Sequence, residues 1–240
     1  MSLSYTVSSP FGSPTPSVRP VVFIVDDDVS IRESLSLQML NEGWQTEAFA
    51  TAQEYLARPP VTVPSCLVLD IMLPGMNGLE LQRLIADEWK VTPIIFITGH
   101  GDVPKTVQAM KAGAIEFLTK PLKGEVLLPA VRNALMRSHN ALNHKTEIER
   151  LRSRFATLTR REQQVMQLVV LGQPNKLIAD ALGISEITVK AHRGRVMQKM
   201  GAESLADLVR IAGKLQPAAA VRAARICPPH VAGAQQSNVA

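Results

Sequence analysis

The sequence predicts a doubly wound α/β domain, a (βα)5 unit with a parallel sheet, followed by a separate all-α domain. Short apolar runs alternate with segments of helical periodicity over about the first half of the chain, as parallel strands covered by helices on both faces require. Beyond residue 158 the apolar residues follow the helical period, and glycines recur at intervals too short for a βα unit. The 240 residues suffice for two domains of ordinary size.

Five segments have the pattern of strands in the α/β domain. Four are largely apolar runs of the kind that is buried in a covered sheet, and the fifth, QTEAFA, is more polar and suits an edge. The segments are VVFIV at 21–25, QTEAFA at 45–50, CLVL at 66–69, PIIFI at 93–97 and AIEFL at 114–118. Helix starts lie between them: Thr51 with Glu54 forms a capping-box pattern, and Asn77 precedes Gly78 and an apolar-periodic run.

The remaining segments connect or flank the two domains. From 123 to 155 the helical pattern is nearly uninterrupted, and apolar residues recur at roughly heptad spacing, which indicates one long helix. The first residues are rich in Ser and Pro without the apolar core of a secretory signal, and no run reaches the roughly 18 apolar residues of a membrane span, so we expect a cytoplasmic protein. The expected organisation is a disordered leader at 1–19, an α/β domain at 20–140, a helical linker at 141–156, a helical domain at 157–215 and a disordered tail at 216–240.

Charge is divided unevenly between the two halves of the chain. Residues 20–140 carry 14 acidic and 10 basic side chains, a net charge of −4, whereas residues 141–240 carry 7 acidic and 15 basic ones, a net charge of +8. A basic helical domain is suited to a polyanionic partner. The C-terminal half is therefore a candidate nucleic-acid-binding region.

Polar side chains follow four of the expected strands at their carboxyl ends. In doubly wound sheets, ligands bind outside this edge, where the strand order reverses. Three carboxylates in one cleft repel one another, and a hard divalent cation with oxygen ligands relieves the repulsion, so Mg²⁺ is the expected cofactor. The residues are Asp26, Asp27 and Asp28 after the first strand, Asp70 after the third, Thr98 after the fourth and Lys120 after the fifth.

These groups suit phosphoryl transfer to a carboxylate. A cation neutralises the charge that a phosphoryl group brings to Asp70, while the Thr98 hydroxyl and the Lys120 ammonium can bind the phosphoryl oxygens. For each residue alone a simpler role is open, because the aspartates at 26–28 could cap the following helix and Lys120 could be a surface charge. Their occurrence at successive strand ends favours one shared site.

Residues 20–140 resemble the receiver domain of two-component response regulators. The resemblance rests on VDDD at 25–28, LVLDIMLPGMNG at 67–78, ITGHGD at 97–102 and FLTKP at 117–121, and the GHGDV stretch is similar to the FixJ subfamily. It implies that Asp70 accepts the phosphoryl group and that Asp28 caps a helix. It further implies that Mg²⁺ is held by Asp26, Asp27, Asp70 and the backbone carbonyl of Met72. Thr98 and Lys120 would then bind the phosphoryl group, and Thr98 and Phe117 would form a switch.

The same resemblance implies a two-state protein that a sensor histidine kinase phosphorylates. Phosphorylation would shift Thr98 and Phe117 together and alter the fourth helix, the fifth strand and the fifth helix, a surface that the family uses for dimerisation.

Other interpretations of these residues remain open. Phe117 could instead be a packing residue, since aromatic side chains are usually buried in the core. The α/β domain could also be a constitutive dimerisation module that pairs the 123–155 helix as a coiled coil. A phosphatase is disfavoured, because Met72 stands where that class of enzyme expects an acid, and we expect no enzyme.

The segment from 158 to 212 has the punctuation of four short helices. Thr159 with Glu162 forms a capping box, Pro174 suits the opening of the second helix, Gly183 suits a tight turn, Ser185 and Gly201 bound the third helix, and Ser204 caps the fourth. On the third helix, Val189, Val196 and Met200 share one face. The opposite face carries Lys190, Ala191, Gly194, Arg195 and Gln198.

This segment resembles the LuxR-type helix-turn-helix of FixJ and NarL relatives, and the resemblance rests on NKLIADALGIS and TVKAHRGRVMQKMGA. The resemblance implies a transcriptional regulator that binds double-stranded promoter DNA as a homodimer on phosphorylation, with RNA polymerase as a further partner. We expect Lys190 and Ala191 to meet base edges, with Gly194 on the same face in place of a larger polar residue. Phosphate contacts are expected from Lys176, Thr188, His192, Arg193, Arg195 and Lys199. His192 could instead pack inside the domain, and Gly194 could be a tolerated weak point of the helix.

Overall fold

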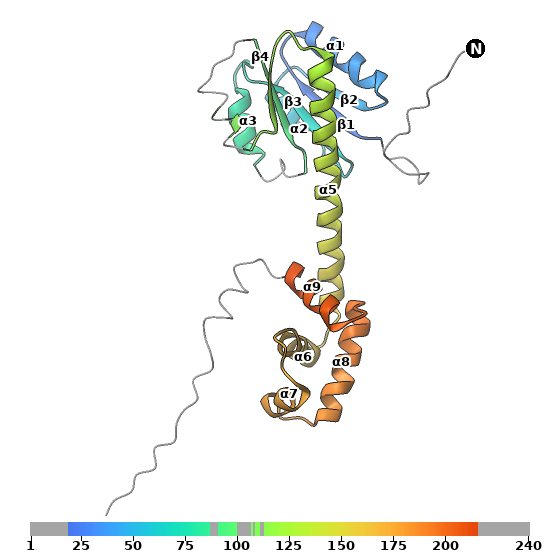
Figure 1. Ribbon diagram of the computed structural model, residues 1–240. Coiled ribbons are helices and arrows are strands. Elements are labelled where there is room, and N and C mark those ends of the chain that lie inside the picture. Colours follow the sequence, from blue (N-terminus) through green and yellow to red (C-terminus); the bar gives the residue numbers. More distant parts are fainter. Residues whose placement is uncertain (1–18, 87–90, 100–106, 108, 111–112, 216–240) are drawn as a thin grey trace, which may run out of the picture. The chain divides into compact units, whose positions relative to one another are not determined.

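The computed structural model describes residues 19–86, 91–99, 107, 109–110 and 113–215, and the expected leader and tail lie almost wholly outside them. The chain divides into two compact units between His144 and Lys145. Figure 1 shows a mixed sheet-and-helix unit at the N-terminal side and a helical unit at the C-terminal side. Each unit is described by itself.

The N-terminal unit contains one sheet of five parallel strands in the order β2-β1-β3-β4-β5. The strands are β1 (Val21–Val25), β2 (Gln45–Phe49), β3 (Ser65–Asp70), β4 (Ile94–Thr98) and β5 (Glu116–Thr119). All residues of β1, β3 and β4 are buried, because their apolar runs lie between two helical layers, whereas β2 is partly exposed at the edge. The predicted doubly wound sheet is confirmed.

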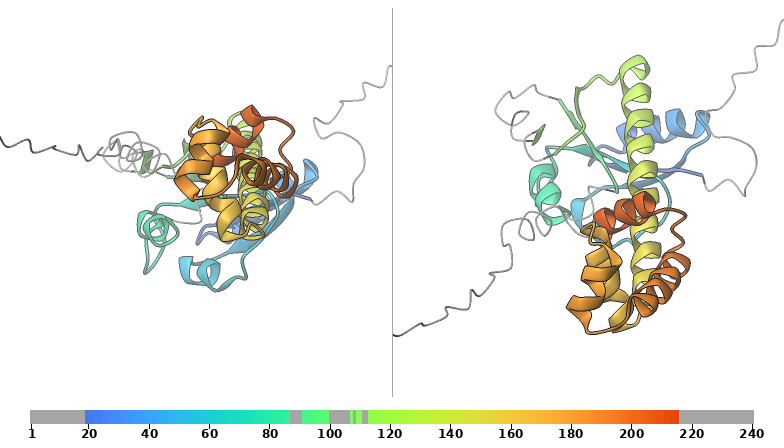
Figure 2. Two further views of the ribbon diagram at one scale, coloured as in Figure 1. Left: turned by 90° about the horizontal axis from the view of Figure 1, so that it is seen from below. Right: turned by 60° about the horizontal axis from the view of Figure 1, so that its bottom comes forward.

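Helices cover both faces of this sheet (Figures 1 and 2). On one face, α2 (Ala52–Ala57) and α3 (Gly78–Leu84) pack Tyr55 and Leu81 against Phe23 of β1. On the other face, α1 (Val29–Asn41) and the N-terminal part of α5 (Gly124–Ala156) pack Met39 and Val131 against Ile24. The helix expected between the fourth and fifth strands falls in a segment of which most residues lie outside the described part of the chain.

α5 is a single helix of 33 residues, as the uninterrupted pattern from 123 to 155 predicts. A buried polar contact fixes its middle to the sheet. The Ser138 hydroxyl accepts a hydrogen bond from the Ser65 N–H at 2.9 Å and donates one to the Val91 carbonyl. The hydroxyls of Ser65 and Thr92 are also 3.0 Å apart. These bonds satisfy buried polar groups at the start of β3, where an unpaired group would cost stability.

Up to residue 215, where the described part of the chain ends, the C-terminal unit consists of four helices and the end of α5, and Figure 2 shows it from two further sides. The helices are α6 (Arg160–Val170), α7 (Asn175–Leu182), α8 (Glu186–Met200) and α9 (Leu205–Leu215). Leu151 of α5 joins the core that Val165, Ile178, Val189 and Leu208 form. No helix among the described residues is long and apolar enough to cross a membrane.

The predicted helix ends of this unit are confirmed. Thr159 and Glu162 form a full capping box, and the Ser185 side chain accepts a hydrogen bond from the Thr188 N–H. Gly183 and Gly201 end α7 and α8 with left-handed φ angles of 64° and 65°, which a residue with a side chain rarely adopts. Local sequence chemistry thus sets the lengths of the helices.

Candidate functional site

The first candidate site is an acidic pocket at the carboxyl ends of the strands. β1 lies between β2 and β3, so the strand order reverses between β1 and β3. Asp26 and Asp27 directly follow β1, and Asp70 is the last residue of β3. One carboxylate oxygen from each of the three residues lies within 4.8 Å of the others. The predicted convergence of these aspartates is therefore observed.

Lys120, which follows β5, bridges two of these carboxylates. Its Nζ atom is 2.7 Å from Oδ2 of Asp26 and 2.6 Å from Oδ2 of Asp70. The other oxygen of Asp70, Oδ1, accepts the Met72 N–H at 2.9 Å. The side chains of Asp26 and Asp70 are almost fully buried, whereas Asp27 is exposed at the mouth of the pocket. A positive charge thus already lies against the group that the sequence predicts as phosphoacceptor.

Burial and charge act in opposite directions in this pocket. Burial raises the pKa of the Asp26 carboxyl, and this effect exceeds the lowering by the Lys120 ammonium and the Asp28 N–H. Burial by itself lowers the pKa of Lys120, but its contacts with Asp26 and Asp70 outweigh burial, so that pKa rises. A further positive charge in the pocket would therefore stabilise the ionised form of its carboxylates.

Arg32 of α1 supports the acidic loop from behind. Its guanidinium donates hydrogen bonds to the backbone carbonyls of Asp26 at 2.7 Å and Asp27 at 3.0 Å. Asp28 caps α1 as expected, because its carboxylate accepts the Ser30 N–H at 2.9 Å. The hydrogen bond from the Ser30 hydroxyl, and after it that from the Ser30 N–H, holds the pKa of Asp28 below its usual range. Arg32 is not among the residues predicted from the sequence, although a basic residue one turn into a helix that begins at an acidic loop is a signal for such a contact.

Gly78 brings the start of α3 against the backbone of Asp70. A Cβ atom at position 78 would lie 2.4 Å from the Asp70 carbonyl oxygen, and the Gly78 N–H donates to the Ile71 carbonyl at 3.0 Å. Asn77 and Glu80 form a full capping box that fixes this helix start. The close approach requires glycine, since any side chain would displace the backbone of Asp70, the predicted phosphoacceptor.

The two predicted switch residues lie on neighbouring strands beside the pocket. Thr98 is the last residue of β4 and is buried, and its carbonyl accepts the Lys120 N–H at 2.8 Å. Phe117 on β5 is half-buried and packs against the core on the α2–α3 face. The packing role of Phe117 is thus present, and the switch role stays a prediction. Residues 100–102 of the ITGHGD motif lie outside the described part.

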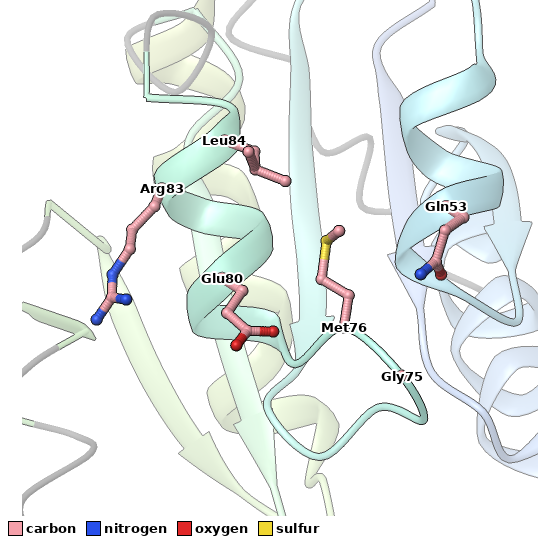
Figure 3. Close-up of a pocket in the computed structure, with 6 residues that line it drawn as sticks. All are labelled: Gln53, Gly75, Met76, Glu80, Arg83 and Leu84. Carbon is pink, nitrogen blue, oxygen red and sulfur yellow. The ribbon is translucent and has the colours of Figure 1, made fainter.

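A separate open groove of about 500 Å³ lies between α2 and α3 (Figure 3). None of the predicted phosphorylation residues lines it, and the Glu80 carboxylate at its side is engaged with the Asn77 N–H. The lining residues are Gln53, Gly75, Met76, Glu80, Arg83 and Leu84. This groove is distinct from the acidic pocket.

The second candidate site is the outer face of α8. Val189, Val196 and Met200 are buried against the core of the unit, as predicted. The opposite face is open, and a Cβ atom added to Gly194 would meet no atom within 4 Å. The exposed members of the predicted DNA-binding set are Lys176 on α7 and Lys190, Ala191, Gly194 and Arg195 on α8.

The other four predicted DNA-binding residues are half-buried, and three of them make polar contacts within the C-terminal unit. Arg193 donates to the Asn175 side chain at 2.7 Å, and Thr188 lies 2.9 Å from the Ser185 hydroxyl. His192 has a buried Nδ1 atom without a hydrogen-bond partner among the described residues. The fourth, Lys199, pairs with Glu162 at 2.7 Å and donates to the Thr157 carbonyl at 3.1 Å.

The Lys199–Glu162 pair ties α8 to the start of α6. Glu162 is only 2% exposed, and the Lys199 ammonium, together with the Thr159 N–H, holds the pKa of that carboxyl below its usual range. Arg154 of α5 donates to the Met200 carbonyl at 3.0 Å, which adds a cation at the C-terminal end of α8. These contacts fix the orientation of α8 inside its own unit.

Comparison with known proteins identifies the two units. The model of the response regulator receiver domain matches residues 22–132, and the model of bacterial regulatory proteins of the luxR family matches residues 156–212. Nodulation protein W of Bradyrhizobium diazoefficiens is 48% identical over 83% of this chain and 88% of its own length. Transcriptional regulatory protein FixJ of Rhizobium meliloti is 42% identical over 80% of this chain and 94% of its own length.

A solved structure agrees with these sequence matches. Response regulator StyR is 45% identical, with a TM-score of 0.73, over 82% of this chain and all of that one. The acidic pocket thus lies in a receiver domain, and α8 lies in a LuxR-type DNA-binding domain. The chain therefore belongs to the response regulators that join a receiver to a LuxR-type helix-turn-helix, and it is a transcription regulator and not an enzyme.

Proposed function

We propose that a sensor histidine kinase phosphorylates Asp70 and that phosphorylation converts this cytoplasmic regulator to a homodimer that binds promoter DNA and acts on RNA polymerase. The observation that carries the proposal is the convergence of Asp26, Asp27 and Asp70 within 4.8 Å, with Lys120 bridging two of them. Three carboxylates and one ammonium are the groups that phosphoryl transfer to an aspartate requires.

The donor set of the pocket fits Mg²⁺. Its three side chains offer carboxylate oxygens, the ligands that this hard cation prefers. Burial, with a smaller contribution from the neighbouring Asp70 carboxylate, raises the pKa of Asp26, so a bound cation would favour its ionised form. Asp26, Asp27, Asp70 and the backbone carbonyl of Met72 would hold the ion. When bound, it would neutralise charge on the phosphoryl oxygens.

The residues of the chain itself orient the reaction. The Met72 N–H fixes one oxygen of Asp70, so the carboxylate is held in one orientation. Lys120, already 2.6 Å from Asp70, can pair with a phosphoryl oxygen, and Thr98 at the adjacent strand end can bind another with its hydroxyl. A shift of Thr98 and Phe117 would then change the surface of the fourth helix, β5 and α5 and favour the dimer.

A dimer would present two α8 helices to half-sites about one DNA turn apart. Lys190, Ala191 and Gly194 form the exposed face that we assign to base edges. Phosphate contacts are assigned to Lys176 and Arg195, which are exposed, and to Thr188, His192 and Arg193, which are half-buried. Lys199 would reach a phosphate only if its pair with Glu162 opens.

The test uses the full-length chain with Mg²⁺ and either acetyl phosphate or beryllofluoride. We expect the wild type to become dimeric in light scattering and to bind a DNA duplex, selected beforehand from a random pool, more tightly. Asp70→Asn should do neither. Glu33→Gln, an exposed carboxylate on α1, is the matched control and should behave as the wild type. Identical behaviour of wild type and Asp70→Asn would instead support a constitutively dimeric, phosphorylation-independent regulator.

A further inference from the structure

Ile187 is an unexplained apolar side chain on the DNA-binding unit. It is 79% exposed, the largest value among the exposed large hydrophobic residues of the described chain. It belongs to α8, yet it is not among the residues that pack against the core of the unit. Water therefore surrounds an apolar side chain that the fold itself leaves without a partner.

Local helix stability does not account for isoleucine at this position. Ile187 is the second residue of α8, after Ser185, whose side chain already caps the helix through the Thr188 N–H. A β-branched residue has a lower helix propensity than Ala or Glu. Neither capping, propensity nor burial favours isoleucine here, so the reason must lie outside the isolated unit.

The position of Ile187 on α8 indicates what its partner is. Lys190, Ala191 and Gly194 follow it at intervals of three, four and seven residues, so all four share one face of the helix. Each of them is exposed, and the space above Gly194 is open. Ala191 and Gly194 thus form a low surface beside the branched side chain of Ile187 and the ammonium of Lys190.

From this geometry we infer that Ile187 contacts the C5-methyl group of a thymine in the major groove and specifies thymine at one position of each half-site. The inference rests on the proposed function of α8 as the DNA-binding helix. The first residues of such a helix reach base edges, and the thymine methyl is the apolar group that the major groove offers. A side chain without donors or acceptors cannot satisfy the polar edges of the other bases.

The low surface that Ala191 and Gly194 form next to Ile187 allows this contact. Small side chains at 191 and 194 allow α8 to approach the floor of the groove, whereas longer side chains there would hold Ile187 away from the bases. The contact would bury one methyl group of thymine against an aliphatic side chain. Burial of one methyl group changes affinity by about fourfold.

The test begins with a DNA duplex that the full-length chain, with Mg²⁺ and beryllofluoride, selects from a random pool. Each thymine of one half-site is then replaced singly by deoxyuridine, which removes only the methyl group. We expect the wild type to lose about fourfold in affinity at one position. Ile187→Ala should lose the same factor on the thymine duplex and be indifferent to uracil at that position.

Two variants separate this contact from general effects. Leu171→Ala removes another exposed aliphatic side chain, 61% exposed in the turn after α6, and should keep the full uracil sensitivity of the wild type. Lys190→Ala should weaken specific binding and also keep that sensitivity. Because Ile187 is exposed and alanine has the higher helix propensity, Ile187→Ala should unfold at or slightly above the wild-type midpoint.

Each outcome has one meaning. If the wild type selects a specific duplex but no thymine-to-uracil change weakens it, or if Ile187→Ala retains the uracil sensitivity, the methyl contact is refuted while DNA binding by α8 stands. If the full-length chain selects no duplex, or if Lys190→Ala and Ile187→Ala both bind as the wild type does, the proposed function of α8 fails together with the contact.

Discussion

The acidic pocket and the outer face of α8 are built in opposite ways. The pocket gathers side chains from the ends of β1, β3 and β5, buries two carboxylates and holds an ammonium within 2.7 Å of both. The face of α8 comes from one helix of 15 residues, and its members are exposed. The pocket places interacting, mostly buried charges between several elements, whereas the α8 face carries almost no packing constraint.

Because of this difference, substitutions at the two sites should have different effects on protein stability. A change inside the pocket alters buried charges or the backbone of Asp70, so it should alter stability as well as phosphorylation. A change on the exposed face of α8 should alter DNA binding and leave folding intact, because surface substitutions usually shift stability little. Substitutions on the α8 face should therefore alter the DNA target without altering the acidic pocket.

Two glycine variants should give the largest contrast. Gly78→Ala should destabilise the receiver by about 3 kcal/mol, since its Cβ would lie 2.4 Å from the Asp70 carbonyl oxygen. Gly194→Ala should stabilise the C-terminal unit by about 1 kcal/mol, because its Cβ meets nothing and alanine favours the helix. Denaturant unfolding of both variants measures this, and destabilisation by Gly194→Ala would contradict an open face.

Two lysines of α8 should separate DNA binding from folding. Lys199→Met should lower the free energy of unfolding of the C-terminal unit by about 2 kcal/mol, because it leaves the buried Glu162 without its cation. Lys190→Met should leave the unfolding free energy unchanged and weaken specific DNA binding by about tenfold or more. Unfolding curves and DNA titrations of both variants decide this. Equal stabilities would show that Lys199 has no structural role.

The two units should respond to acid in opposite directions when Mg²⁺ is removed by chelation. Glu162 has a lowered pKa, so its stabilising contribution is present above its ordinary pKa of 4.5 and is lost as the pH falls through the folded value. Asp26 has a raised pKa, so its contribution is present below 3.8 and is lost as the pH rises through the folded value.

Neutral variants measure these two contributions. We expect Glu162→Gln to cost about 1.5 kcal/mol near neutral pH, with the difference from wild type shrinking in acid. Asp26→Asn should instead stabilise the metal-free receiver near neutral pH, with the difference again shrinking in acid. Unfolding of each variant and the wild type from pH 3 to 7 gives both differences, and two differences of the same sign would contradict the opposite pKa shifts.

The smallest expected effect is that of the metal on the receiver. Mg²⁺ at about five times its dissociation constant should raise the unfolding free energy of the wild-type receiver by about 1 kcal/mol, because ligand binding to the folded state stabilises it. Asp27→Asn should lose this response, since the variant lacks an exposed carboxylate of the pocket. The C-terminal unit serves as an internal control and should not respond. A wild type that is indifferent to Mg²⁺ would remove the metal from the proposal.

Sequence by itself determined the elements of this protein and the types of residue at its two sites. Continuous apolar runs located the strands within two residues, and the caps at Asn77, Thr159 and Ser185 are local signals that need no distant partner. The sequence predicted a parallel sheet without its strand order, and the aspartates converged because parallel strands end at one edge.

Tertiary structure alone decided which partners these residues have. The bridge from Lys120 to Asp26 and the pairing of Lys199 with Glu162 join residues whose separation along the chain carries no signal. The approach of Gly78 to Asp70 is likewise a matter of packing. Hydrogen bonds and ion pairs act over about 3 Å, so their partners are fixed only when the fold has brought the elements together.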